Sequence, residues 1–331
     1  MRYDRLLFAI ALLSLPCSVL ALDDEAQAAK EEGMRLYNIS HSTAALAYLE
    51  KAANAGDVES MYYMGEAERR QHMGSMTRAA LEWYLKAADH GDPYAMLRLH
   101  SGGACVAGDY CPEEVEGWRE KALAITLPKA EAGDTDAMVA LYYIYAALND
   151  EDEGVDWLER AAEAGNPEAQ YRMGSMIHGG YGWYFLESRR LKAAERWLRK
   201  AAEQGYVPAM DALAEVLGKE NRPEAAWRWK VKASNNGYLE ERLTMGGCYL
   251  DPERWNEKIR EGLCQNKKNV VKGWGISYAV FKETGNDTAE WIMDKSRGDM
   301  TPEKIQEAEE LAQEWLNKEP PLSKFPPRYG F

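Results

Sequence analysis

A glycine recurs every 32 to 42 residues through most of this 331-residue chain, and each copy sits in the same local pattern. The six glycines are Gly56, Gly91, Gly133, Gly165, Gly205 and Gly237. A bulky apolar residue, in five cases aromatic, stands eight positions before each, a mostly small pair stands four and three before, and Met or Leu stands eight after. An internal repeat of this period is typical of stacked two-helix units, so it constrains the fold more than any other feature.

The spacing inside one unit explains why it forms helices. Trp197 precedes Ala201 by four positions and Ala202 by five, so all three side chains share one helix face. Small residues on that face let a neighbouring helix approach closely. Gly205 then suits the left-handed residue that ends a helix. Asp or Asn follows four of the six glycines and favours the start of the next helix, so the pattern predicts helix, tight turn, helix, repeated.

The segments 87–96, 161–174 and 197–205 resemble Sel-like repeats, which are variable-length relatives of the tetratricopeptide repeat. The resemblance covers about residues 30–250 and is weakest at the third unit, where Ile125, Pro128 and Lys129 depart from the pattern. It implies an all-α fold, a right-handed α-α superhelix of helix-turn-helix repeats. We expect residues 22–250 to form this solenoid. Residues 251–331 should form a C-terminal helical cap with a proline-rich tail, or else a partner-binding appendage.

The first 21 residues have the features of a cleaved signal peptide. Arg2 and Arg5 precede a ten-residue apolar core, which is too short to span a bilayer, and we place cleavage after Ala21. Pro16 before Cys17 fits a lipidation motif poorly, so we do not expect a lipoprotein. No later stretch approaches eighteen apolar residues, so we expect a periplasmic protein without an integral membrane segment after cleavage.

Four cysteines remain beyond the leader. An even number in an exported chain suggests disulfides, and four cysteines allow three pairings. We favour the local pairs Cys105–Cys111 and Cys248–Cys264, because residues far apart in the sequence of a solenoid are also far apart in space. No histidine stands at ligand spacing from these cysteines, so we expect no metal site.

Charge and motifs narrow the function. The net charge of −14 gives the chain no basic footprint for nucleic acid, whereas it would attract a protein with a basic surface. The same charge also serves solubility. Gly273 to Ser277 lacks the spacing of a nucleophile elbow, and the metalloprotease and phosphate-loop motifs are absent. We therefore expect neither catalysis nor a cofactor.

The remaining candidate is a binding surface. In related repeats the concave groove carries the ligand contacts, and insertions between helices, such as the one around Trp183, often bear function. Aromatic residues and arginine are enriched at interfaces. The candidate partner-binding residues for the concave face are Tyr62, Glu66, Arg69, Arg98, Tyr143, Arg172, Trp183 and Asp211.

Two functions fit these expectations. The architecture is similar to that of periplasmic immunity proteins that neutralise type VI secreted phospholipase effectors. This implies a secreted toxic effector with a basic surface as the partner. It is also similar to exported Sel-like scaffolds or regulators that assemble polysaccharide-export or signalling complexes. Gene neighbourhood would discriminate between the two.

Overall fold

The computed structural model describes residues 22–100, 117–251, 268–316 and 318–329. All its regular elements within these ranges are helices, and the predicted all-α solenoid of helix pairs is confirmed. The expected signal peptide, including Cys17, lies outside the described residues. So do Cys105, Cys111 and Cys264.

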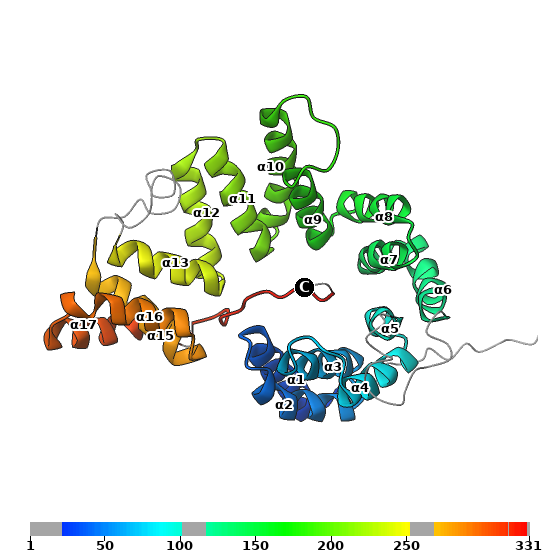
Figure 1. Cartoon of the computed structure of the whole chain (residues 1–331), viewed down its shortest axis with the longest axis horizontal. Helices are drawn as coiled ribbons and strands as arrows, with labels where there is room; N and C mark the ends of the chain where they lie inside the picture. Colours follow the sequence, from blue (N-terminus) through cyan, green and yellow to red (C-terminus); the bar gives the residue numbers. More distant parts are fainter. Residues whose placement is uncertain (1–21, 101–116, 252–267, 317, 330–331) are drawn as a thin grey trace, which may run out of the picture.

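The helices follow one another around a curved path, and up to residue 250 each helix packs against the next (Figure 1). They are α1 (Asp24–Asn38), α2 (Ser42–Asn54), α3 (Val58–Gln71), α4 (Arg78–Asp89), α5 (Pro93–His100), α6 (Gly117–Glu131), α7 (Thr135–Ala147), α8 (Glu151–Glu163), α9 (Pro167–His178), α10 (Glu187–Glu203), α11 (Val207–Lys219), α12 (Pro223–Asn235), α13 (Leu239–Leu250), α15 (Val270–Thr284), α16 (Asp287–Ser296) and α17 (Pro302–Ala312), with a short 3-10 helix η2 (Arg297–Asp299).

The repeat glycines end helices as the sequence predicts. All six have a φ between +83° and +100°, the left-handed region that glycine adopts without a steric penalty. The polar residue after the turn then caps the next helix. Asp57 accepts a hydrogen bond from the backbone N–H of Ser60 at 2.7 Å, and Asn166 accepts one from Ala169 at 3.0 Å. These local signals set the helix boundaries along most of the array.

The small residues of the repeat lie at the centre of the core. Ala87, Ala161 and Ala201 are fully buried, and Trp157 and Trp197 are buried beside them. Tyr48 occupies the same repeat position but is half exposed at the first unit. Pro128 departs from the repeat pattern but lies inside α6 without ending the helix.

The helix path curls until its two ends meet. The imidazole Nε2 of His41, at the start of α2, lies 2.6 Å from the carbonyl oxygen of Thr284 at the end of α15. One continuous buried cluster contains Leu49 from α2 together with Leu239, Val280 and Leu322 from the other end of the chain. The array is therefore a nearly closed ring, with the C-terminal tail crossing its centre (Figure 1).

The expected boundary between residues 250 and 251 falls at the end of α13. Beyond it, α15 packs on α13, and α16 and α17 pack on α15 around a small core with Trp274, Met293 and Ala308. Among the described residues, no helix has the length and apolar character that crossing a membrane requires.

Candidate functional site

The concave groove is occupied by the tail of the same chain. Arg328 forms an ion pair with the buried carboxylate of Asp92 at 2.7 Å, and its backbone carbonyl accepts a hydrogen bond from the Tyr62 hydroxyl. Its guanidinium also lies 4.7 Å from the ring centre of Tyr94. The next residue, Tyr329, packs edge-on against Tyr143 at a centroid distance of 5.2 Å. The end of the tail is thus held by α3, α5 and α7.

Consecutive tail residues also join the two ends of the array. Ser323 donates its N–H to the carbonyl of Gly237 and accepts one from the N–H of Leu239, at 2.9 and 3.0 Å. Lys324 donates its N–H to the carbonyl of Asn38 at 2.9 Å. Two features require glycine at position 237. Its φ is +83°, and a Cβ atom there would stand only 2.3 Å from the carbonyl oxygen of Pro321. The tail is therefore an integral part of the ring.

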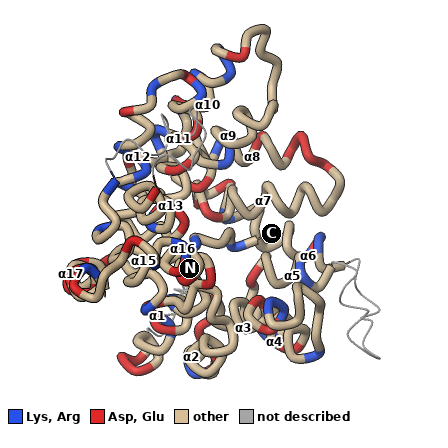
Figure 2. Tube along the Cα trace, turned by 60° about the vertical axis from the view of Figure 1, so that its left-hand side comes forward, with Lys and Arg blue, Asp and Glu red and all other residues tan. Residues whose placement is uncertain are grey.

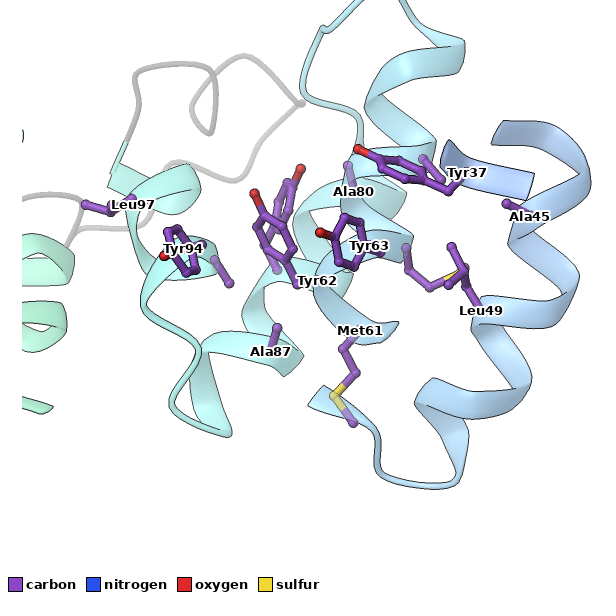
Figure 3. Packing of buried hydrophobic residues seen from close by; sticks show 14 of the residues in the cluster. Tyr37, Ala45, Leu49, Met61, Tyr62, Tyr63, Ala80, Ala87, Tyr94 and Leu97 are labelled. Atoms are coloured by element: carbon purple, nitrogen blue, oxygen red, sulfur yellow. The ribbon is translucent and has the colours of Figure 1, made fainter. Parts of the chain in front are cut away.

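A row of tyrosines lines the part of the groove that meets the tail. Tyr37, Tyr63, Tyr62 and Tyr94 follow one another across α1, α3 and α5 (Figure 3), and the ring centres of Tyr62 and Tyr63 lie 5.4 Å apart. Burial raises the pKa of Tyr62 well above its usual value, so its hydroxyl stays protonated and can donate to the tail carbonyl.

Four of the eight predicted partner-binding residues are buried inside the ring: Tyr62, Glu66, Arg69 and Arg98. Glu66 accepts hydrogen bonds from Arg98 at 2.6 Å and from the Tyr84 hydroxyl at 2.7 Å, which ties α3, α4 and α5 together. Arg69 donates to the carbonyl of Gly74 at 2.8 Å. We expected these side chains to face solvent. That expectation is wrong, because it assumed an open groove, whereas neighbouring helices and the tail cover α3.

Three more predicted residues are half-buried: Tyr143, Arg172 and Asp211. Arg172 is held by Glu168 at 2.7 Å and lies over the ring of Tyr143 at 4.9 Å. Asp211 accepts a hydrogen bond from Lys230 at 2.9 Å. Each of these side chains contacts another residue of the same chain. A partner would therefore have to replace these contacts in order to bind them.

Lys230 also links two carboxylates beneath the groove. Its ammonium lies 2.7 Å from Glu241 in addition to its contact with Asp211. Burial raises the pKa of Glu241 to about 8, because one ammonium does not compensate two carboxylates away from water. The raised pKa favours the protonated form of Glu241 over a wider pH range than in the unfolded chain.

Trp183 is the predicted residue that stands in solvent. Its side chain is 87% exposed on the loop between α9 and α10, and this loop arcs outward from the ring, away from the tail (Figure 1). We expected Trp183 on the concave face, and that placement is wrong, because the loop extends from the outer edge. Its exposure makes it the candidate contact that remains.

The described residues contain no group of three or more His, Cys, Asp or Glu side chains that could hold a metal ion. Cys248 is fully buried in α13 and is engaged in a disulfide. Because the other three cysteines lie outside the described residues, both predicted pairings stay predictions.

The position of the tail could not be predicted from the sequence pattern. Lys324, Arg328 and Tyr329 give the C-terminal segment a basic and aromatic character, which suits a groove that offers the carboxylate of Asp92 and several tyrosines. That character was the available signal, together with the prolines that keep the segment extended. It does not identify the surface that receives the segment.

Stacked helix pairs with a curved inner face place this chain in the class of α-solenoid proteins. In the comparison with protein families, part of this array matches the Sel1 repeat. The Sel1 repeat model matches residues 42–57, 58–92, 137–166 and 167–206. Repeats of this kind mediate protein–protein interactions, and no enzymatic family is indicated.

Several known proteins are similar. An uncharacterised protein of Neisseria meningitidis is 27% identical over an alignment of 168 residues, and the match covers 41% of this chain and 34% of that protein. The crystal structure of a protective antigen of uropathogenic Escherichia coli with an SLR fold superposes with a TM-score of 0.47 at 21% identity, over 89% of this chain and 62% of that one. Immunity protein PA5088 of Pseudomonas aeruginosa superposes with a TM-score of 0.41 at 17% identity, over 86% and 88%. The chain thus spans about a third of the Neisseria protein and less than two thirds of the antigen.

Proposed function

We propose that this protein is a non-catalytic immunity protein that binds a secreted toxic effector and blocks it. The effector is a phospholipase delivered by type VI secretion. The observation that carries the proposal is the combination of a Sel1-repeat scaffold with a net charge of −14. An enzyme that attacks phospholipids benefits from a basic surface that tolerates anionic headgroups. An acidic solenoid is attracted to such a surface and can cover it.

Because the tail fills the concave groove, a partner has to bind elsewhere on the scaffold or displace the tail. A partner that entered the concave side would have to displace Arg328 from Asp92 and Tyr329 from its aromatic contacts. Each lost contact would subtract from the binding free energy. We therefore propose that the effector docks on the outer surface of the ring.

The proposed place of action is the periplasm, reached by the signal peptide expected at residues 1–21. The mature protein should begin at Leu22. An intact-mass measurement of the exported protein checks this, and a mass that includes a lipid on Cys17 would contradict the proposal.

The proposed function is tested by co-expression in the periplasm with the phospholipase effector encoded beside this gene. Cells that carry both proteins should survive, whereas cells with the effector alone should lyse. A catalytically inactive effector controls for toxicity unrelated to lipid hydrolysis. Equal killing with and without this protein would overturn the immunity function and favour a role as an envelope scaffold.

A further inference from the structure

Large apolar side chains are exposed mainly at one place in the described part of the chain. Of the seven that are exposed there, four lie within residues 181–186: Tyr181, Trp183, Phe185 and Leu186. Trp183 is 87% exposed and Phe185 is 76% exposed, and their rings contact each other at a centroid distance of 6.4 Å. An exposed apolar patch of this kind marks an interaction site more often than a chance feature of the surface. We call residues 181–186 the aromatic loop.

The aromatic loop is held at both ends. The N–H of Tyr181 donates to the carbonyl of Met176 at 2.8 Å, which ties the start of the loop to α9. At its other end the carbonyl of Leu186 accepts from the N–H of Arg189 at 3.0 Å, where α10 begins. Tyr184 packs inward on the core while Trp183 and Phe185, on either side of it in sequence, point outward. The backbone that carries the two exposed rings is thus restrained at both ends, which lowers the entropy that binding would cost.

An acidic helix lies beside the aromatic loop. α8 carries six acidic residues and one arginine, and Figure 2 shows acidic residues gathered on this helix. α8 packs against α9, the helix that leads into the aromatic loop, and partial burial together with the carboxylates of Glu159, Asp152 and Asp156 raises the pKa of Tyr181. All three side chains belong to exposed residues. The outer surface therefore joins two exposed aromatic rings to a cluster of negative charge.

We propose that the aromatic loop and the acidic side of α8 form the docking surface for a protein partner with an apolar pocket bordered by Lys and Arg. Trp183 and Phe185 enter the pocket, and the α8 carboxylates pair with its basic border. The inference rests on the proposed function, because it identifies the partner with the secreted effector. The charge of α8 argues against insertion of these rings into a bilayer, since anionic lipids would repel it.

The test measures binding of the purified effector to the purified protein by surface plasmon resonance. Trp183→Ala with Phe185→Ala should raise the Kd by at least about 30-fold, mainly through faster dissociation, as expected for central aromatic anchors. The matched control is Tyr48→Ala, which removes an exposed aromatic ring from α2. It should change the Kd by less than about twofold.

The acidic contribution is tested separately. Asp152→Asn, Asp156→Asn and Glu159→Gln combined should slow association by about tenfold at low salt and reduce its salt dependence, because charge acts mainly on the encounter. Glu307→Gln, Glu309→Gln and Glu310→Gln combined remove the same charge from α17 and should leave the association rate unchanged.

The outcomes separate the two proposals. If the wild type binds and protects while the loop variants do so equally well, this docking surface is wrong and the immunity function stands. If the wild type does not bind the effector, both fail. Co-sedimentation with vesicles of phosphatidylethanolamine and phosphatidylglycerol should show no binding. Vesicle binding that depends on Trp183 and Phe185 would replace the protein partner with a membrane and overturn the inference.

Discussion

At the scale of single residues, two tryptophans of the same region have opposite environments. Trp197 is 7% exposed and lies at the aromatic position of its repeat, whereas Trp183 stands in solvent. Trp197→Ala should lower the free energy of unfolding by about 3–5 kcal/mol, the cost of deleting a buried aromatic side chain. Trp183→Ala should change it by less than about 0.5 kcal/mol. Urea denaturation followed by circular dichroism measures both, and equal losses would show that the repeat position does not determine burial.

The raised pKa of Glu241 predicts how the stability of the fold depends on pH. A glutamate in the unfolded chain loses its proton near pH 4.5, whereas Glu241 in the folded ring keeps it to about pH 8. Between these values the folded state binds more protons, so its stability falls as the pH rises. Glu241→Gln should make the fall in Tm between pH 5 and pH 8 shallower. Its exposed neighbour supplies the control, since Glu240→Gln should keep the wild-type slope.

At the scale of elements, the tail is stabilised by the ion pair between Arg328 and Asp92. Burial raises the pKa of Asp92, and Arg328 partly offsets this by favouring the charged form. Arg328→Ala should cost about 1–3 kcal/mol, because a buried carboxylate loses its charged partner. The carboxylate of Asp92 also accepts the N–H of Ala95 at 2.8 Å, a role that asparagine can keep.

A double-mutant cycle isolates the ion pair from other effects of the tail. In an Asp92→Asn background, Arg328→Ala should cost about 1 kcal/mol less than in the wild type, because a neutral amide does not need the guanidinium. Equal costs in the two backgrounds, measured by chemical denaturation, would mean that the tail is held by its aromatic packing alone.

The helices could be predicted from the sequence, whereas the position of the tail could not. The reason is the distance along the sequence between the residues that interact. Gly205 and Asn166 act on residues within a few positions, so their effect can be deduced from the local pattern. Arg328 meets Asp92 across 236 positions of sequence, and no local pattern specifies that contact. Glu66 was misplaced for the same reason, since its burial depends on Arg98 and Tyr84 from the next two helices. Trp183 was recognised as a candidate because it lies in an insertion, but the side of the ring from which it projects depends on tertiary structure.

At the scale of the whole molecule, ring closure changes how the array unfolds. In an open solenoid each repeat contacts only its neighbours, so distant repeats are coupled weakly. Here the first and last units share one buried cluster, and the tail bonds to both. The full chain should therefore unfold in one cooperative step.

Deletion of residues 317–331 tests this coupling. The shortened chain should unfold in a broader transition or in two steps, because the ends lose their shared contacts. Hydrogen exchange should increase in α1 and α13 together. A synthetic peptide of residues 317–331 added in excess should restore part of the lost protection. It should bind more weakly than the attached tail, because the covalent link gives the tail a high effective concentration. A single unchanged transition in the deletion variant would show that the tail contributes little.

The join at Ser323 and Lys324 also limits how such a gene can change. An open array gains or loses a helix pair without disturbing the units beyond its neighbours. In this protein two adjacent tail residues bond to Gly237 and Asn38, so one short segment bridges the two ends of the array and fixes the distance between them. A duplicated or deleted repeat would change the distance between the two ends of the array, and the tail could then no longer bond to both. We therefore expect sequences that share this tail to vary in the lengths of their loops while keeping the same count of helix pairs.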